Sequence, residues 1–140
     1  MERDLVQVYF SNTEIWLVGS RTWNGPYRAS GAPAVLAASV PSRQLGEAVL
    51  TQFFLLKKYT AADENPQFYK YRKKHISWKR FAVSYHLIDV WKTETAFSLE
   101  LCEMNPDFSF SPDGTHSFSL PLTCDTAELG DGIFDLIHMS

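Results

Sequence analysis

Apolar and polar residues alternate in three runs between residues 95 and 122. Side chains two positions apart lie on the same face of a β-strand, so each run predicts a strand with one buried face. Ser111-Pro-Asp-Gly114, between the last two runs, is typical of a tight turn. We therefore expect an antiparallel β-meander, whose apolar positions are Phe97, Leu99 and Leu101, then Phe108 and Phe110, then Phe118, Leu120 and Leu122.

The N-terminal part of the chain also predicts strands. Leu5–Phe10 and Ile15–Val18 are short β-prone runs separated by polar, turn-forming residues, which is the pattern of a β-hairpin. Residues 19–33 contain several glycines and prolines, so we expect a long loop there without a helix or strand. Residues 34–40 predict one more short strand.

Two helices are predicted in the middle of the chain. The first begins at Ser42, whose hydroxyl is expected to cap it, and runs to about Tyr59. The second is favoured from Phe68 to about Leu87, although the alternation after residue 80 is also typical of a strand. The apolar stripe of the first helix, at spacings of three or four, consists of Leu45, Val49, Phe53 and Leu56.

A last helix is predicted after residue 125. Asp125-Thr-Ala-Glu128 has the D-x-x-E form of a capping box, in which each acidic side chain accepts from the other residue's backbone N–H. Leu129, Ile133 and either Leu136 or Ile137 supply its apolar stripe. A helix with such a stripe must pack on the sheet.

Length and element order together define the expected fold class. A chain of 140 residues with a hydrophobic fraction of 45% is large enough to bury one core. Strands come first, two helices follow, and more strands precede the last helix. This order predicts a single α+β domain over residues 1–140, with a mainly antiparallel sheet packed against about three helices.

Segments 40–49 and 124–133 echo one another. Each has a strand end, a polar cap and then Leu-Gly, followed by an acid, a small residue and a β-branched residue. Gly46 and Gly130 each cost a helix about 1 kcal/mol relative to Ala, so we expect a compensating close approach of a neighbouring backbone. The echo is either a structural repeat or a coincidence between two amphipathic helices.

Charge is segregated along the chain. Eight of the 13 Lys and Arg residues lie between Lys57 and Arg80, whereas residues 93–140 carry nine acids and no Lys or Arg. The formal net charge is only -3, so the total conceals this distribution. The two parts are expected to present electrostatic fields of opposite sign.

Catalytic, metal and cofactor motifs are missing from the sequence. The four histidines lie far apart, and none belongs to a spacing typical of metal ligands. Pairs that could do acid-base chemistry, such as Glu100 with Glu103 or His86 with Asp89, occur without any motif that marks a pocket. We therefore predict a protein that has no cofactor and no enzymatic activity, and that works by binding another macromolecule.

A cytoplasmic location is expected. The N-terminus has three charges before only a short apolar run, unlike a signal peptide, and no stretch approaches the roughly 18 apolar residues that cross a bilayer. Cys102 and Cys124 are expected to be free thiols, because a domain of this size needs no disulfide.

Several short motifs occur in order along most of the chain. They are Val8-Tyr-Phe10, Trp16-Leu-Val18, Ser42-Arg-Gln-Leu-Gly-Glu-Ala-Val49, Trp78-Lys-Arg80 and Glu128-Leu-Gly130. In this order they resemble the contact-dependent growth inhibition (CDI) immunity protein family, and the chain is CdiI-like. The resemblance implies a bacterial cytoplasmic protein that forms a 1:1 complex with the C-terminal toxin domain of a CdiA-type exoprotein, typically a nuclease, and blocks it.

A contact surface for such a toxin is predicted in the acidic half of the chain. Toxins that act on nucleic acids tend to be basic, because Lys and Arg contacts to phosphate supply much of their affinity. Acids in or beside the meander are therefore the candidate partner-binding residues, with two aromatic residues of the 19–33 stretch as possible anchors. These are Glu100, Glu103, Asp107, Asp113 and Asp125, with Trp23 and Tyr27.

The alternative function is nucleic-acid binding through residues 57–80. There aromatic residues, which could stack on bases, are interleaved with cations, most densely from Phe68 to Arg80. The same pattern also fits a helix with an aromatic buried face and a solvated basic face. The low pI of about 5.8 counts against a dedicated nucleic-acid binder.

Overall fold

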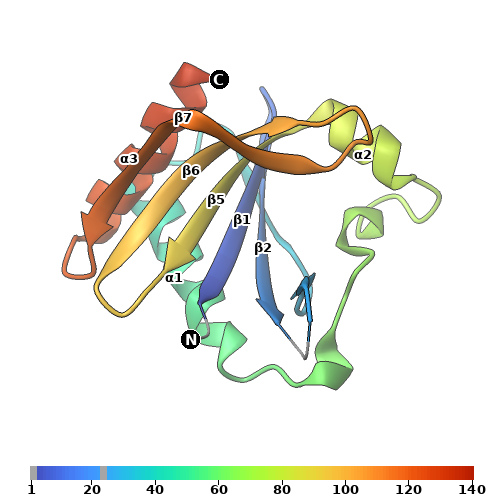
Figure 1. The fold of residues 1–140 in the computed structure, drawn as a ribbon, viewed down its shortest axis with the longest axis horizontal. Helices are drawn as coiled ribbons and strands as arrows, with labels where there is room; N and C mark the ends of the chain where they lie inside the picture. Colours follow the sequence, from blue (N-terminus) through green and yellow to red (C-terminus); the bar gives the residue numbers. More distant parts are fainter. Residues whose placement is uncertain (1–2, 23–24) are drawn as a thin grey trace.

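Within residues 3–22 and 25–140, which the computed structural model describes, seven antiparallel β-strands and three α-helices form the predicted α+β fold (Figure 1). The sheet order is β3-β2-β1-β5-β6-β7, and β4 pairs with β2. The strands are β1 (Asp4–Phe10), β2 (Glu14–Thr22), β3 (Tyr27–Ala29), β4 (Ala34–Ala37), β5 (His86–Lys92), β6 (Ala96–Met104) and β7 (Phe110–Pro121). The helices are α1 (Ser42–Leu56), α2 (Trp78–Ser84) and α3 (Thr126–Met139), with short 3-10 helices at Ala61–Asp63 and Phe68–Lys70.

The N-terminal hairpin forms as predicted. β1 pairs with β2, placing Val8 opposite Leu17, and its other edge pairs with β5, so β1 lies inside the sheet. The expected loop over residues 19–33 is wrong in part, because β2 continues to Thr22 and Tyr27–Ala29 pair with it as β3. The glycines and prolines flank this short strand, and Gly31 just after it has a φ of 75°.

Helices α1 and α3 cover one face of the sheet and build the main core with it (Figure 1). The apolar face predicted for each helix is the face that packs on the strands. Of the two predicted alternatives at the end of α3, Leu136 is buried and Ile137 is only half-buried. The residues of the two predicted apolar faces that are at most 2% exposed are Leu45, Val49, Phe53 and Leu56 of α1, and Leu129, Ile133 and Leu136 of α3.

The two helices cross where the sequence places its echo. A Cβ atom added at Gly46 would lie 1.9 Å from the carbonyl oxygen of Thr126, and one added at Gly130 would lie 1.8 Å from that of Ser42. Each glycine thus faces the first residue of the other helix. The expected close backbone approach is confirmed, and its reciprocal geometry explains why the two segments look alike.

Both ends of α1 differ from the prediction. Pro41, not Ser42, is the N-cap, and no side chain caps the first turn. Ser42 is already the first helical residue, and its backbone is the part of α1 that meets Gly130. The helix ends at Leu56, before Tyr59, and the Leu56 carbonyl oxygen accepts a hydrogen bond from Arg21.

The helix predicted from Phe68 to Leu87 is wrong over most of its length. Only α2 is α-helical; Ser77 caps it by accepting from the Arg80 backbone N–H at 3.2 Å, and β5 begins at His86. Residues 70–75 contain four Lys and Arg residues, and like charges three or four positions apart repel one another in a helix. The aromatic residues share a core without sharing a helix.

The turn predicted at Ser111-Pro-Asp-Gly114 is also wrong, because these residues lie within β7. Between the pairs Glu100–Ser117 and Cys102–Pro112, β6 advances by two residues and β7 by five, which makes a wide irregularity in the ladder. Asp113 accepts there from the backbone N–H groups of Thr115 and His116, both at 2.9 Å. The Ser111-Pro-Asp-Gly114 sequence therefore forms part of a bulge inside one long strand and does not separate two strands.

The capping box predicted for α3 is present. Asp125 accepts from the backbone N–H of Glu128 at 2.8 Å, and the Glu128 carboxylate accepts from that of Asp125 at 3.4 Å. Cys102 and Cys124 are free thiols, as expected.

Replacing Gly46 with alanine tests the helix crossing. The new Cβ would collide with backbone that cannot rotate away, so we expect Gly46→Ala to lower the free energy of unfolding by about 3 kcal/mol or more. Gly25→Ala is the control, because no described residue comes within 4 Å of its added Cβ. Urea unfolding followed by circular dichroism measures both, and equal stability of the two variants would contradict the close crossing.

Candidate functional site

The second face of the sheet is partly covered by the segment that links α1 to β5. Most of its aromatic side chains pack with the hairpin in a second apolar cluster. In this cluster the centroid of the Tyr9 ring lies 5.3 Å from the ring centroids of both Phe68 and Phe81. The exceptions are Tyr59, which packs against the main core, and Tyr71, which is 57% exposed. The cations of the same segment point outward, since all but the half-buried Lys70 are exposed: Lys57, Lys58, Arg72, Lys73, Lys74, Lys79 and Arg80.

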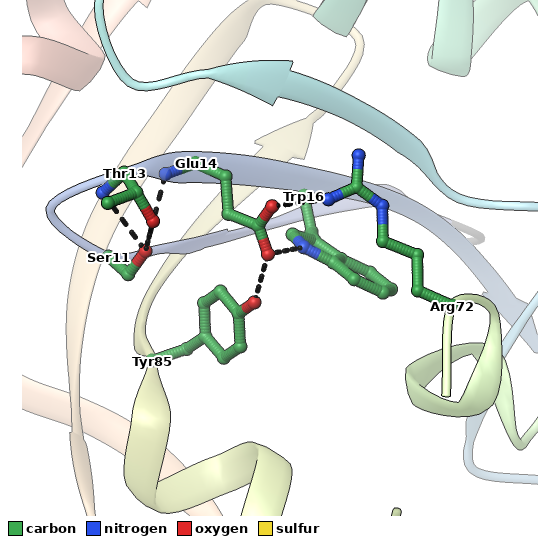
Figure 2. Close-up of polar contacts among 6 residues, drawn as sticks. All are labelled: Ser11, Thr13, Glu14, Trp16, Arg72 and Tyr85. Carbon is green, nitrogen blue, oxygen red and sulfur yellow. Dashed lines mark hydrogen bonds and ion pairs between the residues drawn. The ribbon is translucent and has the colours of Figure 1, made fainter. Parts of the chain in front are cut away.

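A single carboxylate joins this segment to the hairpin. Figure 2 shows Glu14, at the start of β2, between the side chains of Trp16, Arg72 and Tyr85. Its oxygens accept hydrogen bonds from Trp16 Nε1 at 2.8 Å, from Arg72 Nη1 at 2.6 Å and from the Tyr85 hydroxyl. We call these four residues the Glu14 cluster.

Electrostatics in the Glu14 cluster favour an ionised Glu14. Partial burial works against its charge, but the hydrogen bonds from Tyr85 and Trp16, together with Arg72, outweigh burial and hold the pKa of Glu14 below its ordinary value of 4.5. Burial and the neighbouring Glu14 carboxylate raise the pKa of Tyr85 to about 12. The cluster is therefore a carboxylate with neutral and cationic donors at neutral pH.

A hollow of about 450 Å³ lies beside the Glu14 cluster, and Ser11, Lys73 and Ser84 also line it. Its polar groups are largely occupied by the protein itself. Ser11 accepts from the backbone N–H groups of Thr13 and Glu14 at 3.3 Å, and Arg72 is paired with Glu14 (Figure 2). The arrangement is suited to holding the segment between α1 and β5, which we call the basic segment, against the β1–β2 hairpin.

Three of the predicted partner-binding acids lie close together on β6 and β7. Glu100 and Asp113 line one small hollow, and Glu103 and Asp113 line a second. Asp107 belongs to the turn that joins the two strands. The structure thus groups Glu100, Glu103, Asp107 and Asp113 on one hairpin.

The other predicted partner-binding residues lie elsewhere. Asp125 caps α3, beyond the far end of β7. Tyr27 lies on β3 at the opposite edge of the sheet, where its hydroxyl donates to the Arg3 carbonyl oxygen at 2.7 Å and its ring meets that of Trp91 at 5.1 Å. Trp23 is outside the described residues.

These acids differ in how much their own chain uses them. Backbone N–H groups and His116 bind Asp113, and they hold its pKa well below the ordinary range. The side chain and backbone of Ser109 bind Asp107 and also lower its pKa. Glu103, in contrast, is an exposed side chain at the end of β6, and it is the most available of the four for a partner.

Asp89 is a buried carboxyl group that sequence reasoning considered only as a partner of His86. The two residues lie three apart on β5, so they point to opposite faces of the sheet. Asp89 is 9% exposed, its Oδ1 has no hydrogen-bond partner among the described residues, and burial raises its pKa to about 6. Its position inside an apolar run, between Ile88 and Val90, was the signal that could have identified it.

Glu14 was missed because most of its partners are distant in the sequence. Its partners Arg72 and Tyr85 lie 58 and 71 positions away, and only the fold brings them together. Trp16, two positions on along the same strand face, was the one local indication.

Comparisons with known proteins identify the fold. A chain of the CdiA-CT/CdiI toxin and immunity complex from Yersinia pseudotuberculosis superposes with a TM-score of 0.76 and 11% identity, covering 99% of this chain and 97% of that one. The protein of unknown function NMB0488 from Neisseria meningitidis gives a TM-score of 0.72 at 10% identity, covering 98% and 94%. No family model and no curated protein matches the sequence. At these identities the likeness is one of fold, a CdiI-like fold.

The described part of the chain has neither a membrane-spanning helix nor a metal-binding cluster. Among residues 3–22 and 25–140, no helix has the length and apolarity to cross a membrane. Over those ranges, no three His, Cys, Asp or Glu side chains are grouped so as to hold a metal ion.

Neutralising Glu14 tests the cluster that fastens the basic segment. A carboxyl group whose pKa is lowered by folding stabilises the protein above its ordinary pKa, and that contribution disappears as the pH falls through the lowered value. We expect Glu14→Gln to cost about 1 to 2 kcal/mol at pH 7 and clearly less at pH 3, as measured by urea unfolding.

The matched control is Glu47→Gln. Within the described residues Glu47 pairs only with Arg43, on the surface of α1. Both side chains are more than half exposed, so the loss of this pair should change stability by less than about 0.5 kcal/mol. A Glu14→Gln effect no larger than that of Glu47→Gln, or independent of pH, would argue against the cluster.

Proposed function

We propose that this protein is a CDI immunity protein that binds the C-terminal toxin domain of a CdiA-type exoprotein in the bacterial cytoplasm and neutralises it in a 1:1 complex. The observation that carries the proposal is the likeness in fold to a chain of a toxin and immunity complex, over nearly the full length of both chains. The ordered sequence motifs point to the same class. The protein would act by binding, without catalysing a reaction.

The charge distribution supports a basic partner. The acids of the β6–β7 hairpin are separated in sequence from the cations of residues 57–80, and residues 93–140 contain no Lys or Arg. In space the two groups meet at one point, where Lys79 Nζ lies 5.1 Å from the centroid of the Phe108 ring in the β6–β7 turn. Nucleases carry cations for phosphate contacts, so a nuclease toxin would meet complementary charge on this hairpin. Such complementarity mainly increases the rate of association and selects the partner.

Contact residues are proposed accordingly. Glu103 is the first candidate because it is exposed, with Glu100 beside it as a half-buried second. Asp107, Asp113 and Asp125 hold turns or caps of their own chain and would contribute charge more than direct contacts. Tyr27, on the other edge of the sheet, and Trp23 stay proposed as aromatic anchors.

Nucleic-acid binding by residues 57–80 is the second candidate. The seven exposed cations favour it, because phosphate contacts need accessible Lys and Arg. The aromatic residues weigh against it, since Phe68 is buried and Tyr71 alone among the aromatic residues of 57–80 is largely exposed. Base stacking of the kind that single-strand binders use needs several exposed rings.

Protection of cells tests the proposed function. The toxin domain encoded next to this protein's gene, expressed in a bacterial host, should stop growth, and co-expression of this protein should restore growth. The purified pair should elute as a 1:1 complex that buries about 1,200 to 2,000 Å². A toxin domain from an unrelated CDI locus is the control and should still stop growth.

Two results would oppose the proposal. If growth stays arrested and the purified proteins do not associate, the protein is not the immunity protein of that toxin. If it instead binds single-stranded RNA or DNA with an affinity that falls steeply with salt, the nucleic-acid candidate takes its place.

A further inference from the structure

Most of the large exposed apolar side chains of the described residues gather at one place. Five such side chains are more than 40% exposed, and three of them, Val83, Met104 and Met139, line a single hollow of about 400 Å³. The other two, Phe54 and Tyr71, lie apart on α1 and on the basic segment. A cluster of exposed apolar side chains marks an interaction site more strongly than scattered ones do.

Three elements distant in sequence build this hollow. Val83 comes from the last turn of α2, Met104 is the last residue of β6, and Met139 is the last residue of α3. Cys102 and Phe110, from the paired ends of β6 and β7, also line it. Methionine is flexible and polarisable, so two methionines in one hollow give a surface that can fit the shape of an entering side chain.

The rim of the hollow is acidic. Glu103 and Asp113 line it, whereas none of its lining residues is Lys or Arg. His116 is paired with Asp113 at 2.7 Å, and His86 stacks on Phe10 with ring centroids 5.4 Å apart. Glu103 is therefore the rim charge left for a ligand.

We propose that this hollow is the docking site for a segment of the partner protein that carries an apolar side chain next to a Lys or Arg. The apolar side chain would enter between Val83, Met104 and Met139, and the cation would meet Glu103. This is the usual anatomy of a protein interface, with an apolar centre and a polar rim. The proposal rests on the function proposed above and names the surface that the toxin domain would contact.

The methionine methyl groups give a direct readout. The chain has three methionines, at positions 1, 104 and 139, so a sample labelled with ¹³C in the methionine methyls gives three signals, which Met→Leu variants assign. We expect the signals of Met104 and Met139 to shift or broaden when the toxin domain encoded next to the gene is added in equal amount.

Variants separate the apolar contact from the charge. Met104→Gln should weaken the affinity for the toxin domain by about tenfold, with most of the change in the dissociation rate. Glu103→Lys should slow association by about fivefold at low salt and by less at high salt. The matched controls are Phe54→Gln, an even more exposed apolar residue on α1, and Glu94→Lys, an exposed acid in the turn just before β6.

The outcomes distinguish this inference from the function on which it rests. If the toxin domain binds while the signals of Met104 and Met139 stay unchanged, or if the two test variants bind like their controls, the docking site is wrong and the proposed function stands. If no complex forms, both are overturned. If the methyl signals change with protein concentration alone, the hollow joins two copies of this chain, and the proposed occupant is wrong.

Discussion

The close crossing of α1 and α3 at Gly46 and Gly130 is the constraint on which the rest of the structure depends. Each glycine admits the backbone of the other helix at a distance that no Cβ would allow. The helix propensity lost at each position, about 1 kcal/mol, is offset by packing, because both apolar stripes reach the same face of the sheet. Leu45 and Leu129, each beside a crossing glycine, are both completely buried there.

With one face closed by this helix pair, the other face is left to the segment between α1 and β5. Most of its aromatic residues pack in the cluster that contains Tyr9 and Trp16, and Glu14 ties the segment to the hairpin through Arg72 and Tyr85. The packing turns the cations outward on one part of the surface, whereas the acids concentrate on the β6–β7 hairpin and α3. The separation of charge along the sequence is kept only in part in space, because Lys79 of α2 lies over the Phe108 ring in the β6–β7 turn.

Periodic and locally capped elements could be predicted from the sequence, since their causes lie within a few residues. The stripe of α1, the capping box at Asp125 and the hairpin are of this kind. Residues 68–87 could not be predicted in this way: Phe68 and Trp78 share a core reached by an irregular path, and spacing alone does not distinguish that core from a helix face. The Glu14 cluster and the hollow at Met104 and Met139 depend on long-range contacts, which no local motif encodes.

The central claim is that this chain is a binding domain whose partner meets the acidic end of β6 and β7 and not the basic segment. Amide hydrogen exchange, compared between the free protein and its complex with the toxin domain, tests that claim most directly. The account predicts slower exchange in residues 101–113 and in the last turn of α3, with no change in residues 69–75. Slower exchange confined to residues 57–80 would contradict it.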